Sequence, residues 1–201
     1  MIENSSLLEQ IVKSFSTNSV SKPSPSLVVE ALLEAEKNAK KRQLNYCFEQ
    51  LLGCWQLYFV TGTKKKRNNA GILLGAGRYL PKLITIKLSY SKTTLGLPPE
   101  QTEAGIVENL VDLGILKLVL TGPMQFLVQK NILAFDFTRM QVQLFGFKLY
   151  DGFIRGGSES EQNFYQIGVS KQAFFSYFLI QEEMIAARGR GGGLALWVKS
   201  E

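Results

Sequence analysis

Residues 53–60 read Gly-Cys-Trp-Gln-Leu-Tyr-Phe-Val, and this stretch decides the fold class. In an extended chain, successive side chains point to opposite faces. Trp55, Leu57 and Phe59 therefore share one face, and the residues between them share the other. The alternation predicts a β-strand that follows Gly53.

Strand signals recur along the rest of the chain, separated by turns. They cover residues 79–90, 115–121, 131–138, 141–150, 164–169, 173–180 and 193–199. Residues 106–113 fit either a helix or a short buried strand, because periodicity alone does not separate the two. Many short strands joined by turns predict an antiparallel sandwich or barrel.

Residues 1–52 have a helical period instead. We expect a first helix to begin at a capping box of Ser6 and Glu9. A second is expected from Pro25 to about Arg42, after a linker rich in Ser and Pro, and a third, short one over residues 43–52. The change of period predicts an N-terminal helical extension, residues 1–52, and a β domain, residues 53–201.

The composition narrows the class of protein. With 45% hydrophobic and 20% charged residues among 201, the chain is expected to be folded and globular. It contains no histidine, which removes the commonest general base and metal ligand and argues against an enzyme. The net charge of +6 implies affinity for polyanions, either nucleic acid or an anionic lipid surface.

Several sequence features bear on the location of the protein. No apolar stretch approaches the length that spans a bilayer, so any membrane association is expected to be peripheral. The first residues match neither a signal peptide nor a transit peptide, which predicts a chain that is mature or never exported. Two cysteines are too few for a disulfide framework and fit a reducing compartment.

Two motifs at the ends of the β region carry a resemblance to a known family. They are Leu-Gly-Cys-Trp-Gln-Leu-Tyr-Phe-Val-Thr at residues 52–61 and Arg-Gly-Arg-Gly-Gly-Gly-Leu-Ala-Leu-Trp-Val at residues 188–198. Val-Glu-Asn-Leu-Val at residues 107–111 and Phe-Gly at residues 145–146 lie between them in the expected order. Over residues 44–199 the chain resembles the plastid lipid-associated protein (PAP/fibrillin) family.

The resemblance implies a lipocalin-like antiparallel β-barrel, found in plastids and cyanobacteria and associated with thylakoids and plastoglobules. The expected location is cytoplasmic or stromal, peripheral to the thylakoid membrane. The resemblance also favours a strand around Val107. One departure is clear, because Leu179, Ile180 and Gln181 stand where the family has a Tyr-Leu-Asp stretch.

An eight-stranded barrel either fills its interior with side chains or holds one small ligand. For a ligand-binding barrel, the candidate cavity-lining residues are Trp55, Leu57, Phe59, Phe135, Phe137, Phe145, Phe147, Phe175 and Tyr177. Three polar residues are candidates to hydrogen-bond a quinone carbonyl or a lipid headgroup, namely Arg139, Gln181 and Arg188. The alternatives are a plain aromatic core and ordinary residues at the barrel rim.

Two cationic segments invite a surface role. Lys64, Lys65, Lys66 and Arg67 form a predicted turn that either docks on acidic thylakoid lipids or is simply solvated. Residues 188–193 resemble an Arg-Gly nucleic-acid-binding segment, but the run is short and leads into an apolar strand. We interpret it as a tight turn, and no nucleic-acid partner is expected.

The leading hypothesis is a non-enzymatic protein that binds a lipid, prenylquinone or carotenoid at the thylakoid or plastoglobule surface. No catalytic residue, metal site or cofactor is predicted, since no phosphate loop, metal signature or nucleophile elbow occurs. One alternative is a structural coat or scaffold protein with a solid barrel core. A bilin-lyase-like enzyme of similar barrel type is the other.

Overall fold

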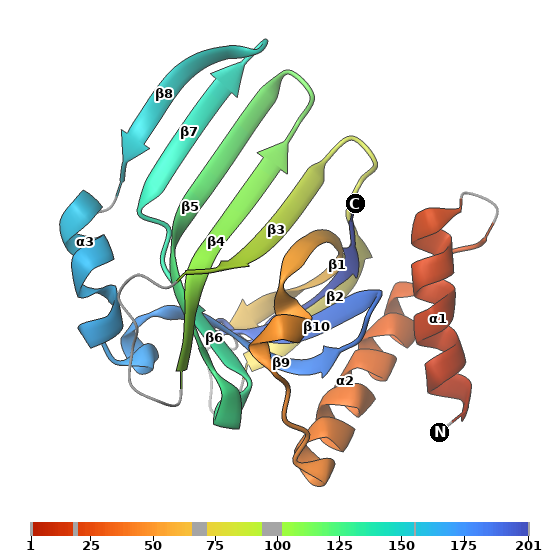
Figure 1. Cartoon of the computed structure of the whole chain (residues 1–201). Coiled ribbons are helices and arrows are strands. Elements are labelled where there is room, and N and C mark those ends of the chain that lie inside the picture. The colour runs from red at the N-terminus through yellow and green to blue at the C-terminus, as the bar shows by residue number, and fades with distance from the viewer. Residues whose placement is uncertain (1, 18–19, 66–71, 94–101, 155, 201) are drawn as a thin grey trace.

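The computed structural model of the chain describes residues 2–17, 20–65, 72–93, 102–154 and 156–200 (Figure 1). Side chains are described in these ranges except at residues 2–6, 63–65, 72–75 and 102. The strands are β1 (Gly53–Lys65), β2 (Ile72–Tyr79), β3 (Thr85–Lys92), β4 (Thr102–Asp112), β5 (Leu116–Leu127), β6 (Ile132–Phe135), β7 (Arg139–Leu144), β8 (Phe147–Phe153), β9 (Ala173–Ile180), β10 (Met184–Gly189) and β11 (Leu194–Lys199).

Eight of these strands close into an antiparallel barrel in the order β4-β3-β1-β11-β10-β9-β6-β5, and β5 pairs again with β4. The closed barrel confirms the predicted fold class. Full closure leaves these eight strands without a free sheet edge along their paired lengths. Residues 106–113, which periodicity left undecided, lie almost entirely within β4 and are extended.

Two long strands, β1 and β5, each exchange one pairing partner for another along their length. The first half of β1 pairs with β3 and its second half pairs with β2. Similarly, the end of β5 pairs with β6, while its beginning pairs with β7, to which β8 adds. The sheet β3-β4-β5-β7-β8 therefore fans out beyond the barrel, with β8 at its outer edge (Figure 1).

Two helices precede the barrel, α1 (Ile2–Ser16) and α2 (Pro25–Arg42). The bounds of α2 confirm the prediction, because Pro25 sits at its first turn and Gln43 ends it in the left-handed region, at φ 50°. The first helix begins at Ile2, four residues before the predicted cap at Ser6. The predicted third helix is wrong, because η1 (Phe48–Leu51) is a single 3-10 turn.

Asn131 explains why the chain is not helical between α2 and η1. Its side-chain amide donates to the carbonyl of Leu44 at 2.6 Å, and its Oδ1 accepts from the backbone N–H of Tyr46 at 3.0 Å. These two bonds use backbone groups that a helix would need for itself. A residue 85 positions away therefore overrides the local helical pattern.

Several strand predictions need correction. Residues 79–90 contain the end of β2 and most of β3, separated by a turn in which the N–H of Ile84 donates to Pro81 at 3.0 Å. Residues 141–150 belong to two strands, β7 and β8, that form a hairpin. The strand predicted at 164–169 is wrong, since α3 (Gly157–Asn163) continues into η3 (Phe164–Gln166) and η4 (Val169–Lys171) follows. The buried ring of Phe164 anchors this segment as a short helical turn.

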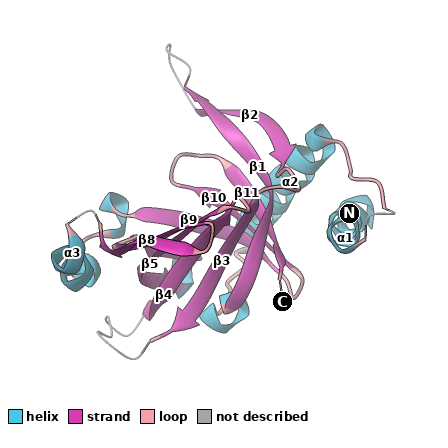
Figure 2. Cartoon of the chain, turned by 90° about the horizontal axis from the view of Figure 1, so that it is seen from above, coloured by secondary structure: helices cyan, strands magenta, loops and turns pink. Residues whose placement is uncertain are grey.

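The apolar side chains form two clusters, one on each side of the barrel wall. One fills the barrel interior around Trp55, Met124 and Trp197. The other lies between the outside of the barrel and the helices, around Ile11, Leu32 and Phe59. Figure 2 shows α1 and α2 on the side of the molecule away from α3.

Candidate functional site: the barrel interior and the groove beneath α3

The barrel interior holds a packed cluster of its own side chains. Aromatic rings meet around Phe175, whose centroid lies 5.1 Å from that of Phe135 and 5.2 Å from that of Trp197. Phe48 and Leu51 of η1, both fully buried, close the end of this cluster. The Trp55 indole N–H donates to the Leu51 carbonyl at 2.7 Å and fixes η1 to the barrel.

Six of the nine apolar residues predicted to line a cavity belong to this interior cluster. They are Trp55, Leu57, Phe135, Phe137, Phe175 and Tyr177. The structure therefore brings them together as expected from the period of two. Their contact with a ligand stays a prediction.

Phe59 faces the other side of the wall. A bulge between Leu57 and Phe59 shifts the register of β1 against β11, so that Leu57 lies opposite Trp197 but Phe59 lies opposite Leu196. An extra residue in a strand reverses the face of every side chain beyond it. The ring of Phe59 consequently packs in the cluster beneath the helices, against Tyr79.

Phe145 and Phe147 also lie outside the interior. They occupy the tip of the β7–β8 hairpin, where their side chains are 67% and 75% exposed. The prediction that they line the cavity is wrong, because β7 and β8 leave the barrel at the point where β5 exchanges β6 for β7.

Arg188 is directed away from the interior and is held by α2. Its neighbour Ala187 belongs to the interior cluster, so Arg188 points outward from β10. Its Nε donates to Oε1 of Glu36 at 2.8 Å, and its Nη1 donates to the carbonyl of Gly192 at 2.6 Å. The hydrogen bond from Arg188 holds the pKa of Glu36 below its usual value, against the opposing effect of burial. The guanidinium is thus part of a structural clamp.

Gln181 lies in the turn between β9 and β10, exposed and beside α1. Its backbone N–H donates to Met184 at 2.9 Å and closes the turn. The side chain is exposed in this turn, and its contact with a ligand stays a prediction.

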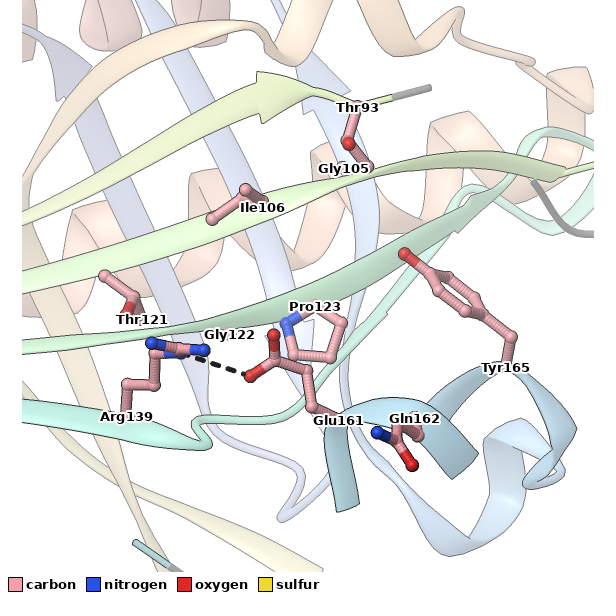
Figure 3. Close-up of a pocket in the computed structure, with 10 residues that line it drawn as sticks. All are labelled: Thr93, Gly105, Ile106, Thr121, Gly122, Pro123, Arg139, Glu161, Gln162 and Tyr165. Carbon is pink, nitrogen blue, oxygen red and sulfur yellow. Dashed lines mark hydrogen bonds and ion pairs between the residues drawn. The ribbon is translucent and has the colours of Figure 1, made fainter. Parts of the chain in front are cut away.

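Arg139 lines a groove on the outer face of the sheet (Figure 3). The groove has a volume of about 340 Å³ and runs between β4 and β5 on one side and α3 with η3 on the other. Its floor is mainly apolar, and its lining residues are Thr93, Gly105, Ile106, Thr121, Gly122, Pro123, Arg139, Glu161, Gln162 and Tyr165. Ligand sites are usually concave and mostly apolar, with a few polar groups that fix orientation.

The exchange of partners on β5 shapes the groove. Pairing with β7 ends at Thr121 and pairing with β6 starts at Met124. Pro123 lies between them, where a missing N–H costs no ladder hydrogen bond on that edge. Gly122 allows the connection after β6 to pass closely, since a Cβ there would lie 2.1 Å from the carbonyl oxygen of Asp136.

The polar groups of the groove converge from both walls (Figure 3). Arg139 Nε lies 3.3 Å from Oε2 of Glu161, and its guanidinium stacks 4.1 Å over the ring of Phe153. Thr138 Oγ1 donates to the same carboxylate oxygen at 2.9 Å. Tyr165 faces the groove from η3, and burial, followed by the charge of Glu161, raises the pKa of its phenol.

Sequence reasoning missed Glu161, Gln162 and Tyr165, because the helix α3 was not predicted. A signal exists at residues 156–161, where Gly-Gly precedes Ser-Glu-Ser-Glu and so places acidic residues in the first turn of a helix.

The interior also holds polar atoms. The hydroxyls of Tyr90 and Tyr177 lie 2.7 Å apart, and burial raises the pKa of both phenols and keeps them neutral. Two further buried atoms, Oδ1 of Asn109 and Nε1 of Trp197, have no hydrogen-bond partner among the described residues. Both side chains point to the inner face of the barrel. Asn109 of β4 lies opposite Leu88 of β3, and Trp197 of β11 lies opposite Leu57 of β1.

The predicted lipid-docking turn lies largely outside the described part of the chain. Lys64 and Lys65 end β1, but their side chains are not described. Lys66 and Arg67 fall between the described ranges. Docking through this turn stays a prediction.

The described residues offer neither a cluster of metal-ligating side chains nor a membrane-spanning helix. They contain no group of three or more His, Cys, Asp or Glu side chains placed to hold a metal ion. Within the same ranges, no helix is both long and apolar enough to cross a membrane. Comparison of the chain with protein-family models, curated proteins and solved structures found no significant match.

Proposed function

We propose that this protein binds a hydrophobic molecule with a polar head, such as a lipid or a prenylquinone, in the groove beneath α3 and without catalysis. The mostly apolar groove with Arg139 and Tyr165 at its walls carries the proposal. Its polar groups favour a ligand with a hydrogen-bond acceptor over a hydrocarbon carotenoid. A hydrocarbon would remove water from Arg139 and Tyr165 without offering them a hydrogen bond.

The apolar floor supports the binding of a long tail. Each buried CH₂ group contributes about 0.8 kcal/mol, so several of them offset the cost of immobilising a ligand. Arg139 supports head-group recognition, because a quinone carbonyl or a phosphate can accept a hydrogen bond from guanidinium nitrogens. The resemblance of residues 52–61 and 188–198 to PAP/fibrillin motifs supports a thylakoid or plastoglobule setting, which remains part of the proposal.

Two observations support a non-enzymatic role. The chain has no histidine. Within the groove, Arg139 and Thr138 hold the carboxylate of Glu161, which favours a structural part for it over acid-base catalysis.

The test measures binding of decyl-plastoquinone by native mass spectrometry and equilibrium titration. Ile106 lies on the groove floor with a half-exposed side chain, so Ile106→Gln should leave the fold intact and weaken binding by about tenfold. Ile167→Gln is the matched control, because Ile167 is similarly exposed but outside the groove. Arg139→Gln should weaken a ligand with a head group more than a plain hydrocarbon.

Equal affinity of wild type and both groove variants would exclude the groove. If Asn109→Leu or a Trp197→Phe change then weakened binding, the ligand would lie in the barrel, against the two buried polar atoms.

The second candidate function is a structural coat or scaffold, which the packed aromatic interior favours. A protein that carries no ligand from its source and binds none of the probes would support this alternative over the carrier.

A further inference from the structure

Six of the thirteen large apolar side chains that are exposed among the described residues lie along one edge of the fanned sheet. They are Leu83 in the β2–β3 connection, Leu113 and Ile115 in the β4–β5 loop, and Phe145, Phe147 and Leu149 in the β7–β8 hairpin. The register of β3 against β4 and of β5 against β7 places these three connections side by side at the same end (Figure 1). We call these six residues the apolar edge.

The apolar edge is built at a conformational cost. Phe145 has φ 49° and Gly146 has φ 81°, so the hairpin makes a two-residue turn with both central residues left-handed. Such turns favour Asn-Gly, and a bulky residue in this region is strained. An aromatic ring held at the tip of an exposed, strained turn points to a role outside the folded core.

We propose that the apolar edge inserts into the surface of a lipid bilayer and docks the protein there. The side chains project from three neighbouring loop tips. They can enter the interface between head groups and acyl chains, because a fluid bilayer needs no complementary surface. Aromatic and aliphatic side chains are favoured at that depth. The proposal concerns the docking face and does not depend on ligand binding in the groove.

The backbone of the apolar edge suits an apolar environment. The N–H of Phe145 donates to Ile115 at 2.8 Å and joins two of the tips, and the N–H of Leu113 donates to Leu116 at 2.9 Å. Gly114 N–H donates to Asp112 Oδ1 at 2.8 Å. Backbone groups that already have partners lose little when they leave water, whereas unpaired groups would oppose insertion.

The charges around the apolar edge complement an anionic lipid surface. Lys82 adjoins Leu83, and Lys117 and Lys148 are the second residues of β5 and β8. The nearby carboxylates are in ion pairs, Asp112 with Lys117 at 3.3 Å and Asp151 with Lys148 at 2.8 Å. Both aspartates are thus paired with lysines, and with +6 over the chain anionic lipids should bind more tightly than neutral lipids.

The inner face of the fan continues the apolar edge toward the barrel. Pairing places Leu118 of β5 between Val111 of β4 and Val142 of β7, on the face that Val107 shares with the core. These three residues are partly buried. Docking of the apolar edge would therefore also remove this apolar face of the sheet from water.

The test is flotation with vesicles of phosphatidylcholine, alone or mixed with phosphatidylglycerol. The double variant Phe145→Asn/Phe147→Ser should lower the partition coefficient by about tenfold or more, since it removes two of the most exposed rings. The control Leu33→Ser/Ile167→Ser removes two exposed apolar side chains elsewhere and should bind as the wild type does. Ile106→Gln should also retain vesicle binding, which separates docking from the proposed groove function.

A second readout follows insertion directly. Phe145→Trp should add tryptophan emission that shifts to the blue with vesicles, because both native tryptophans are already buried. Undiminished flotation of the double variant, or an equal loss in the control, would overturn the proposal. So would a wild type that ignores vesicles but forms a dimer, if Phe147→Ser abolished that dimer, because the apolar edge would then bind a second copy.

Discussion

Arg188 and Glu36 form a buried clamp between the barrel and α2. Glu36 is 8% exposed and accepts from both Arg188 and Lys40. A buried carboxylate needs such partners, because burial alone disfavours its charge. The clamp fixes α2 on the barrel wall at the position where the β10–β11 turn begins.

Glu36→Gln should lower the free energy of unfolding by about 1–3 kcal/mol at pH 7, since it leaves Arg188 without its ionic partner. The pKa of Glu36 is lowered in the folded state, so its stabilising effect is present above the unfolded pKa and is lost as the pH falls through the folded value. Urea unfolding at pH 7 and near pH 3 should therefore show a difference between the two proteins that shrinks in acid.

Glu30→Gln serves as the control, because Glu30 is exposed on the same helix. An equal loss for Glu36→Gln at both pH values would contradict the ionic origin of the stabilisation.

Tyr90 and Tyr177 present a second buried pair, formed by two neutral hydroxyls. Tyr90→Phe should cost about 1–3 kcal/mol, because the Tyr177 hydroxyl would remain buried without its partner. Replacing both tyrosines with phenylalanine should cost less than the sum of the single changes. A double-mutant cycle by urea unfolding at pH 7 measures the coupling, and strictly additive losses would contradict it.

At the scale of elements, the turn of the β7–β8 hairpin places a bulky residue in a backbone conformation that such residues disfavour. Its turn requires two left-handed residues, yet one of them is Phe145. The β1 bulge also sets the position of an aromatic ring. It turns Phe59 toward the helices while Trp55 and Leu57 stay in the barrel. In both cases one residue decides which environment an aromatic ring enters.

Phe145→Asn should raise the free energy of unfolding by about 1 kcal/mol, because Asn tolerates the left-handed region better than Phe. For a chain of this size the midpoint of thermal unfolding should rise by about 2–4 °C. Phe145→Ala is the matched control, since it removes the ring but keeps most of the backbone cost, and it should give no such gain. A melting temperature that falls with Asn would contradict the strain at this turn.

The element predictions succeeded where the local pattern and the tertiary contacts agree. Residues 173–180 were predicted as a strand and form β9 with the same bounds. The strand β10 was missed, because its alanines have weak strand preference and it is extended only by pairing with β9 and β11. The strand predicted at residues 164–169 was wrong because their apolar pattern belongs to two short helical turns around Phe164.

At the scale of the whole molecule, the candidate site could be predicted only in part. Arg139 was selected from the sequence as a polar group of a barrel ligand site, but the structure places it outside the barrel, in the groove, and its contact with a ligand stays a prediction. Its neighbours Glu161 and Tyr165 come from α3 and η3, 22 or more residues later in the chain. Arg188 was selected by the same reasoning, but its bond to Glu36, 152 positions away, could not be foreseen from the local sequence, and its contact with a ligand stays a prediction.

The sequence by itself determined the antiparallel β class, the helical N-terminal region and the period that turns Trp55 and Leu57 inward. These features depend on neighbours within a few residues, where steric and capping preferences act. Only the tertiary structure decided the closure of the barrel, the exchange of partners on β1 and β5, and the fate of each polar side chain. Those outcomes depend on which distant residue lies opposite, and a one-residue bulge is enough to reverse a face.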